Sequence, residues 1–137
     1  MKEKFQRNLN SLERITQFIQ SFVRQNGLSD DIKFAVELVV EELFTNMIKY
    51  YPESNAEIVI KLTKSKEKLI LTLTDFNIHP FDITRVPEYD TAAPLDKRPI
   101  GKLGIHLIKK YMDDIHFEYQ NKVTKLTLVK YLRDLHV

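Results

Sequence analysis

Apolar residues recur at helical spacing in two long segments near the start of the chain. In the first segment this spacing predicts a helix over residues 11–25, which Gly27 ends because glycine is favoured just beyond a helix C-terminus. In the second segment it predicts a helix that begins after Ser29-Asp30, a favourable N-cap pair, and continues to about Tyr50. The apolar positions of the first helix are Ile15, Phe18, Ile19, Phe22 and Val23.

Apolar and polar residues alternate in the middle and at the end of the chain, as they do in half-buried strands. The first alternating positions are Ile58, Ile60, Leu62, Leu69, Leu71 and Leu73. The polar turn at 64–67 divides them into two strands and predicts an antiparallel pair. A third helix is expected at about 103–112. Two last strands are expected near 115–119 and 123–131, joined at 120–122.

The order of these elements indicates the fold class. Residues 2–8 are weakly patterned and fit an edge strand. Strands that are segregated from helices predict an α+β fold, here a two-layer sandwich with a mostly antiparallel sheet and helices packed on one face. A chain of 137 residues suits one domain with a real core, so we expect residues 1–137 to form a single unit.

Composition excludes several classes of protein. Hydrophobic residues make up 43% of the chain and charged residues 29%, which is typical of a globular protein. The formal net charge of +2 is too small, and the basic residues too scattered, to predict direct binding to nucleic acid. No apolar run is long enough to span a membrane and no signal sequence is evident, so we expect no membrane and a cytoplasmic location. Without cysteine there is no disulfide and no thiolate metal site.

Glu42 and Asn46 stand one helical turn apart in the second predicted helix and share a face. An asparagine oxygen suits a hard cation such as Mg²⁺, and a glutamate accepts a proton or orients a hydroxyl. Lys49 continues the same side of the helix. Two interpretations stay open for this side, a magnesium-nucleotide site and the solvated edge of an amphipathic helix.

Asp75 is in phase with the leucines of the second predicted strand, so it lies on their face. A carboxylate at the end of a buried face requires a hydrogen-bond donor, because unpaired burial is costly. That donor is either the amine of a ligand or the backbone of the turn that follows.

A long segment without helical or strand periodicity follows, at residues 76–99, and holds four of the five prolines. Connections of this length inside a small domain are usually functional or disordered, and we interpret this one as a lid. Its basic exit, which includes Arg98, leads to Gly101 and Gly104 at the start of the third predicted helix. Backbone N–H groups at a glycine-flanked helix N-terminus suit a phosphate group.

Taken together, these segments resemble the sequence boxes of the GHKL, or Bergerat-fold, ATPase superfamily, and within it the anti-sigma-factor serine/threonine kinases. Residues 42–46, Glu-Leu-Phe-Thr-Asn, resemble the N box. Residues 75–82 resemble the first glycine box and residues 98–105 the second. Residues 112–114 and 126–130 resemble the closing helix and strand. The resemblance covers nearly the whole chain and implies the histidine-kinase-like ATPase fold.

The resemblance implies a protein serine/threonine kinase that uses ATP and Mg²⁺. Glu42 would act as general base or orient the attacking hydroxyl, and Arg98 would steady the γ-phosphate. Asn46 would hold Mg²⁺, and Asp75 would accept a hydrogen bond from the adenine amino group. The nucleotide-binding residues that it implies are Asn46, Lys49, Asp75, Asn77, Gly101, Lys102, Leu103 and Gly104.

The resemblance also implies the partners. The substrate would be a serine or threonine on an anti-anti-sigma (antagonist) protein, and a sigma factor would be the second partner. The family often forms homodimers, although the sequence locates no face for one.

Two positions depart from the family pattern. Asn77 stands where the first glycine box usually has glycine, although asparagine tolerates a left-handed backbone. Lys102 replaces a second adjacent glycine, where its ammonium either crowds the phosphates or binds them. These departures leave an alternative open, a non-catalytic module that sequesters a partner on the same scaffold with weakened or lost ATP binding. A detached sensor-kinase catalytic domain is a third interpretation.

Overall fold

The computed structural model of the chain describes residues 1–77 and 102–132. Strands and helices follow one another in the order that the hydrophobic pattern predicts. Their bounds are β1 Lys2–Phe5, α1 Ser11–Gln25, α2 Asp30–Tyr50, β2 Ile58–Lys64, β3 Lys68–Asp75, α3 Lys102–Tyr111, β4 Asp114–Gln120 and β5 Val123–Tyr131.

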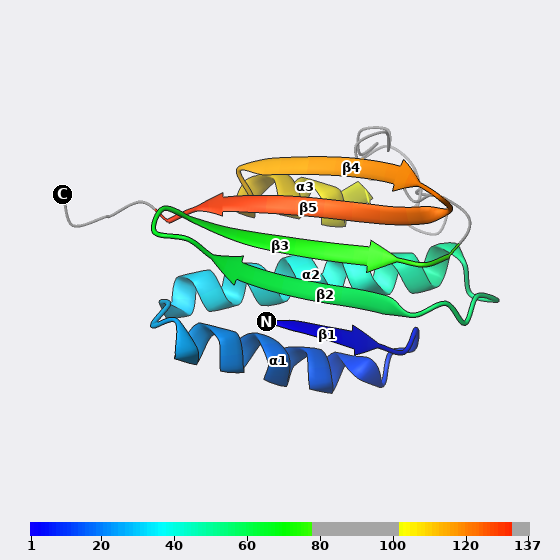
Figure 1. The fold of residues 1–137 in the computed structure, drawn as a ribbon, viewed down its shortest axis with the longest axis horizontal. Coiled ribbons are helices and arrows are strands. Elements are labelled where there is room, and N and C mark those ends of the chain that lie inside the picture. The colour runs from blue at the N-terminus through cyan, green and yellow to red at the C-terminus, as the bar shows by residue number, and fades with distance from the viewer. Residues whose placement is uncertain (78–101, 133–137) are drawn as a thin grey trace.

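The strands form one five-stranded sheet in the order β1-β2-β3-β5-β4, and each neighbouring pair is antiparallel. Figure 1 shows β3 at its centre and β1 and β4 at its edges. The expected N-terminal edge strand is thus present, although β1 covers Lys2–Phe5 rather than the whole of residues 2–8. The turn between β4 and β5 has positive φ at Asn121 (53°) and Lys122 (62°), the backbone that matches the twist of a tight hairpin.

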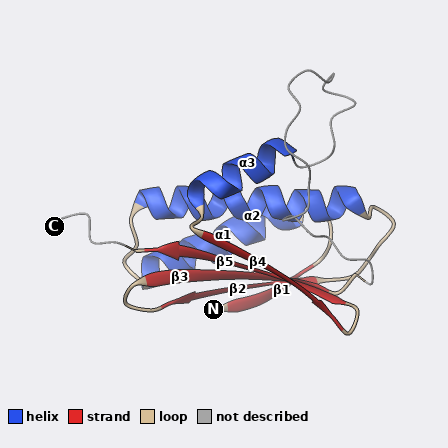
Figure 2. Ribbon diagram, turned by 90° about the horizontal axis from the view of Figure 1, so that it is seen from above, coloured by secondary structure: helices blue, strands red, loops and turns tan. Residues whose placement is uncertain are grey.

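The helices cover one face of the sheet (Figure 2), which confirms the predicted α+β two-layer sandwich. Alternation along the strands sends one set of apolar side chains into the space between the layers. The fully or nearly fully buried strand residues of this set are Ile58, Ile60, Leu62, Leu69, Leu71, Leu73, Leu126 and Leu128. Against them pack the buried faces of α1 and α2, including Phe18, Leu43 and Met47. This packing is the core that fixes the positions of all the elements named above.

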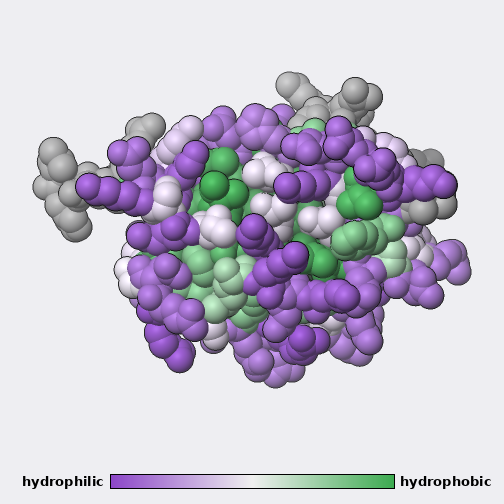
Figure 3. Space-filling view, in the orientation of Figure 1, coloured by the Kyte–Doolittle hydropathy of each residue, from purple (hydrophilic) through white to green (hydrophobic). Residues whose placement is uncertain are grey.

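The opposite face of the sheet carries polar side chains among a few apolar ones. Lys61, Thr72 and Thr127 form one row across β2, β3 and β5. In Figure 3, where the strands lie in front of the helices, this face shows pale and green areas surrounded by hydrophilic residues. The one-sided burial explains why β2 and β3 have the clean period of two that made them predictable.

The helix ends agree with the local sequence signals. The hydroxyl of Ser29 accepts a hydrogen bond from the Ile32 N–H at 3.2 Å and caps α2. Gly27 has a φ of 60°, the left-handed backbone at which glycine favours the end of α1. Helix α3 begins and ends one residue earlier than predicted, which is ordinary fraying of a helix boundary.

Among the described residues, no helix has the length and apolar character needed to cross a membrane. The predicted lid, apart from Phe76 and Asn77, lies outside the described residues.

Candidate functional site

The C-terminal half of α2 carries the first group of predicted site residues. Asn46 is only 3% exposed, and its amide nitrogen has no hydrogen-bond partner in the described part of the chain. Glu42, one turn earlier, is half-buried, and Lys49, one turn later, is exposed. The hydroxyl of Thr45 donates to the carbonyl oxygens of Glu41 (2.8 Å) and Glu42 (3.2 Å), so it is bonded to its own helix. Asn46 is therefore an inward-facing polar residue, and the interpretation as a fully solvated helix edge does not fit it.

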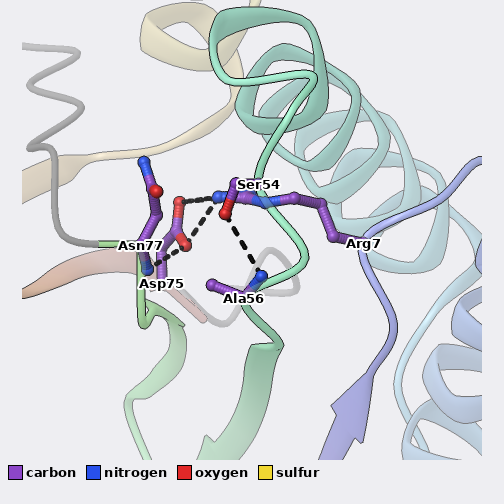
Figure 4. A network of polar contacts seen from close by, with 5 residues as sticks. All are labelled: Arg7, Ser54, Ala56, Asp75 and Asn77. Carbon is purple, nitrogen blue, oxygen red and sulfur yellow. Dashed lines mark hydrogen bonds and ion pairs between the residues drawn. The ribbon is translucent and has the colours of Figure 1, made fainter.

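Asp75 ends β3 on the helix-covered face and is completely buried. Its carboxylate accepts three contacts from the Arg7 guanidinium, with Nη2 at 2.8 Å from each oxygen and Nη1 at 3.3 Å from Oδ2. The Asn77 backbone N–H donates to Oδ1 at 2.9 Å. Figure 4 shows Arg7 reaching this carboxylate from the segment that follows β1. The donor expected for Asp75 is thus present twice within the protein, as a turn backbone and as an arginine.

The charge of Asp75 depends on these donors. Burial raises the pKa of the Asp75 carboxyl above its ordinary value of 3.8, and the Asn77 N–H and the Arg7 guanidinium oppose that rise. The Arg7 side chain is itself only 1% exposed, and its Nε has no partner among the described residues. The pair is therefore a desolvated ion pair, in which losing either partner leaves an uncompensated buried charge.

Thr124 is a candidate site residue that the sequence analysis did not single out. It is directly opposite Asp75 in the β3–β5 register and is fully buried. Residues directly opposite in an antiparallel pair share a face, so its side chain lies beside the Asp75 carboxylate. Its hydroxyl has no partner in the described part of the chain. A signal was available, because Thr124 is in phase with Leu126 and Leu128, as Asp75 is with the leucines of β3.

The structure brings these residues toward one end of the sandwich. Figure 1 shows the C-terminal end of α2, the end of β3 and the start of β5 at the same end of the molecule, where α3 also begins. Lys102, Leu103 and Gly104 form the first turn of α3, so its N–H groups are at this end. Arg98 and Gly101 lie outside the described residues.

Unpartnered buried polar atoms at this end suit a polar ligand. Buried donors and acceptors in folded proteins are nearly always hydrogen bonded, to protein or to bound molecules. The Asn46 amide nitrogen and the Thr124 hydroxyl are exceptions within the described residues, and they belong to the C-terminal half of α2 and the start of β5.

The residues also fit a magnesium ion held together with phosphates. Within the described part of the chain, no group of three or more His, Cys, Asp or Glu side chains is placed to hold a metal. Mg²⁺ seldom needs such a cage, because it keeps several waters and takes phosphate oxygens with one or two protein ligands. The buried Asn46 amide supplies one neutral oxygen of the required type.

Comparison with known proteins agrees with this geometry. Residues 5–130 match the family described as Histidine kinase-like ATPase domain. The serine-protein kinase RsbW of Bacillus cereus (strain AH187) is 29% identical over 109 residues, which cover 76% of this chain and 66% of that protein. The serine-protein kinase RsbW of Listeria monocytogenes is 29% identical over 133 residues, which cover 93% of this chain and 82% of that protein.

In the Bacillus comparison the chain spans just under two thirds of the relative's length. The family match is broader, because it runs from β1 to β5 and includes every element of the sandwich. The chain therefore belongs to the family of histidine kinase-like ATPase domains.

Proposed function

We propose that this protein binds ATP with Mg²⁺ and transfers the γ-phosphate to a serine or threonine of a partner protein. The observation that carries the proposal is the burial of Asn46, one turn beyond Glu42 on α2, with a side-chain nitrogen that has no partner among the described residues. The relatives that share this fold are named serine-protein kinases, which supports the type of reaction.

Each residue has a role that its position permits. Asn46 contributes a neutral oxygen to Mg²⁺, which when bound neutralises charge on the phosphates. Glu42 is half-buried and accepts the proton of the attacking hydroxyl or orients that hydroxyl. Lys49 is exposed one turn later, near the end of α2, and we assign its ammonium to phosphate binding.

Base and phosphate recognition come from the other elements. Asp75 accepts from the adenine amino group, and the Thr124 hydroxyl beside it adds a second polar contact. Asn77 continues the turn beyond Asp75, and its N–H holds the carboxylate in place. The N–H groups at the start of α3, near Gly101, Lys102, Leu103 and Gly104, favour phosphate through the positive end of the helix dipole. Arg98 supplies a further positive charge to the γ-phosphate.

We further propose the biological setting that the resemblance implies. The chain acts as one domain in the cytoplasm, phosphorylates an anti-anti-sigma antagonist and binds a sigma factor. Binding of a sigma factor and phosphorylation of its antagonist are separable activities, so each is tested by itself.

Calorimetric titration with ATP, with and without Mg²⁺, tests the nucleotide site. We expect saturable binding that weakens when Mg²⁺ is removed. Asn46→Ala should lose at least about tenfold in Mg-dependent affinity, or about 1.4 kcal/mol, because one metal ligand is gone. Asn10→Ala is the matched control, since Asn10 is exposed and its side chain makes no capping hydrogen bond. Equal losses in both variants would contradict the assignment of Asn46.

The same titration separates the kinase from its alternative. A protein that binds its partner tightly but binds no ATP at about millimolar concentration, a weak limit for a nucleotide site, would be a non-catalytic module on this scaffold. A phosphorylated serine or threonine on the antagonist would exclude that interpretation.

A further inference from the structure

The carboxylate of Asp75 has no free hydrogen-bonding position in this structure. An ionised carboxylate offers about four lone-pair positions. Arg7 makes three contacts with the two oxygens, and the Asn77 N–H takes the remaining position on Oδ1. An adenine amino group that approaches Asp75 therefore meets a carboxylate whose acceptor positions are already filled.

Arg7 is held firmly in this position. Before it, Phe5 is fully buried and packs edge-on against Phe18, with ring centroids 5.8 Å apart. After it, the Asn8 N–H donates to the Gln6 carbonyl oxygen at 2.9 Å, and the Ser11 hydroxyl donates to the same oxygen at 2.8 Å. The backbone on either side of Arg7 is thus fixed by β1 and by the start of α1. The Arg7 guanidinium therefore has a fixed position at this end of the sandwich.

We propose that Arg7 determines base specificity at the nucleotide site by competing with the purine amino group for Asp75. The inference rests on the proposed nucleotide function. While Arg7 is bound to the carboxylate, Asp75 contributes little binding free energy to a base that carries an amino group. Reading that group requires the ion pair to open, and opening a buried pair is unfavourable. The intact protein therefore binds ATP more weakly than its fold allows, because part of the binding free energy opens the ion pair, and its preference for amino- over oxo-purines is reduced by the same amount.

Arg7→Met tests this competition, because methionine keeps a long unbranched stem and removes every donor. Arg14→Met is the matched control. Arg14 is an exposed arginine with an ion pair to Glu3 at 3.1 Å, and it has no contact with Asp75. Mg-ATP and Mg-ITP are titrated into the intact protein and both variants by calorimetry. A pH of about 8 is chosen to favour the ionised form of the unpaired carboxyl, whose pKa burial raises.

We expect Arg7→Met to bind ATP about tenfold more tightly than the intact protein, which corresponds to about 1.4 kcal/mol. ITP, with an oxo group in place of the amino group, should change by less than about threefold, since it offers Asp75 no donor of that kind. Arg14→Met should match the intact protein for both nucleotides.

Other outcomes overturn the inference in distinguishable ways. If Arg7→Met binds ATP as the intact protein does, or more weakly, Arg7 does not compete for the base, while the nucleotide site stands. If ATP and ITP gain equally, Arg7 affects the site without reading the base. If none of the three proteins binds either nucleotide, the proposed function fails and the competition fails with it.

If Arg7→Met does not fold, an NMR measurement on the intact protein tests whether Arg7 competes with the base for Asp75. The Nε–H signals of Arg7 and Arg14 are assigned through their own side chains by NMR, and Mg-ATP is added to saturation. Competition predicts that the buried Arg7 Nε signal moves strongly as the ion pair opens, while the Arg14 signal stays nearly constant. An Arg7 signal that stays in place while ATP saturates the protein would overturn the inference.

Discussion

At the residue scale, Arg7 and Asp75 are a long-range pair, 68 positions apart in the chain. The alternation of β3 predicts that Asp75 faces the core and needs a donor. It does not identify the donor, because no local pattern connects a residue after β1 with the end of β3. A buried pair of this kind is costly to break from one side, so its removal has measurable consequences for stability.

The first of these consequences is a pH dependence of stability in Arg7→Met. The guanidinium lowers the pKa of Asp75, so its loss raises that pKa further above 3.8 in the folded variant. A raised folded pKa favours the native state while the carboxyl is protonated, and that contribution is lost as the pH rises through the folded pKa. The stability deficit of Arg7→Met should therefore grow across the pH range above 3.8, toward about 3–5 kcal/mol.

Urea unfolding of Arg7→Met and the intact protein across this pH range checks the expectation. Arg14→Met serves as the control, and its deficit should be small and nearly independent of pH, since its ion pair with Glu3 is exposed. A deficit of Arg7→Met that shrinks with rising pH would contradict the role assigned to the pair.

At the element scale, the two hairpins of the sheet use different turns. The β4–β5 turn places Asn121 and Lys122 at positive φ, whereas no residue of the β2–β3 turn does so. Asparagine tolerates this backbone, but lysine adopts it at a cost of roughly 1–2 kcal/mol. The two turns therefore predict opposite responses to glycine.

Lys122→Gly should stabilise the protein by about 0.5–1 kcal/mol, because glycine relieves the left-handed strain and loses only part of the gain to its greater unfolded-state entropy. Lys66→Gly in the β2–β3 turn is the control and should be neutral or destabilising, because there is no positive φ to relieve. Thermal unfolding of both variants gives the comparison. A destabilised Lys122→Gly beside an unaffected Lys66→Gly would mean that this turn is not strained.

The elements themselves follow closely from the sequence, because their burial is one-sided. Leu69, Leu71 and Leu73 are buried on one face, and this face alone produces the period of two. Thr124 was missed for a related reason. Threonine is common on both faces of strands. Thr124 becomes a candidate only because it lies opposite Asp75 in the strand register, which the sequence does not show. The prediction of Asn46 rested on a helical turn, which sequence spacing alone defines.

At the scale of the whole molecule, antiparallel topology brings the ends of separate elements together. Helix α2, β3, β5 and α3 have their relevant ends on the same side of the sandwich (Figure 1), although they are distant in the chain. The sequence predicts the two layers of the sandwich and carries the motifs of the family resemblance. It does not predict the ion pair between Arg7 and Asp75, since that contact depends on how β1 joins the edge of the sheet. Function is therefore expected at this end rather than over the open sheet face or at the β2–β3 turn.

The most direct test of the proposed nucleotide site is the pattern of backbone NMR shifts when Mg-ATP is added to the ¹⁵N-labelled protein. We expect saturable shifts concentrated at Asn46, Asp75 and Thr124, with little change at Ser65 in the turn at the other end of the sheet. Shifts of equal size at both ends, or a spectrum unchanged at saturating nucleotide, would contradict a nucleotide site between α2, β3 and β5.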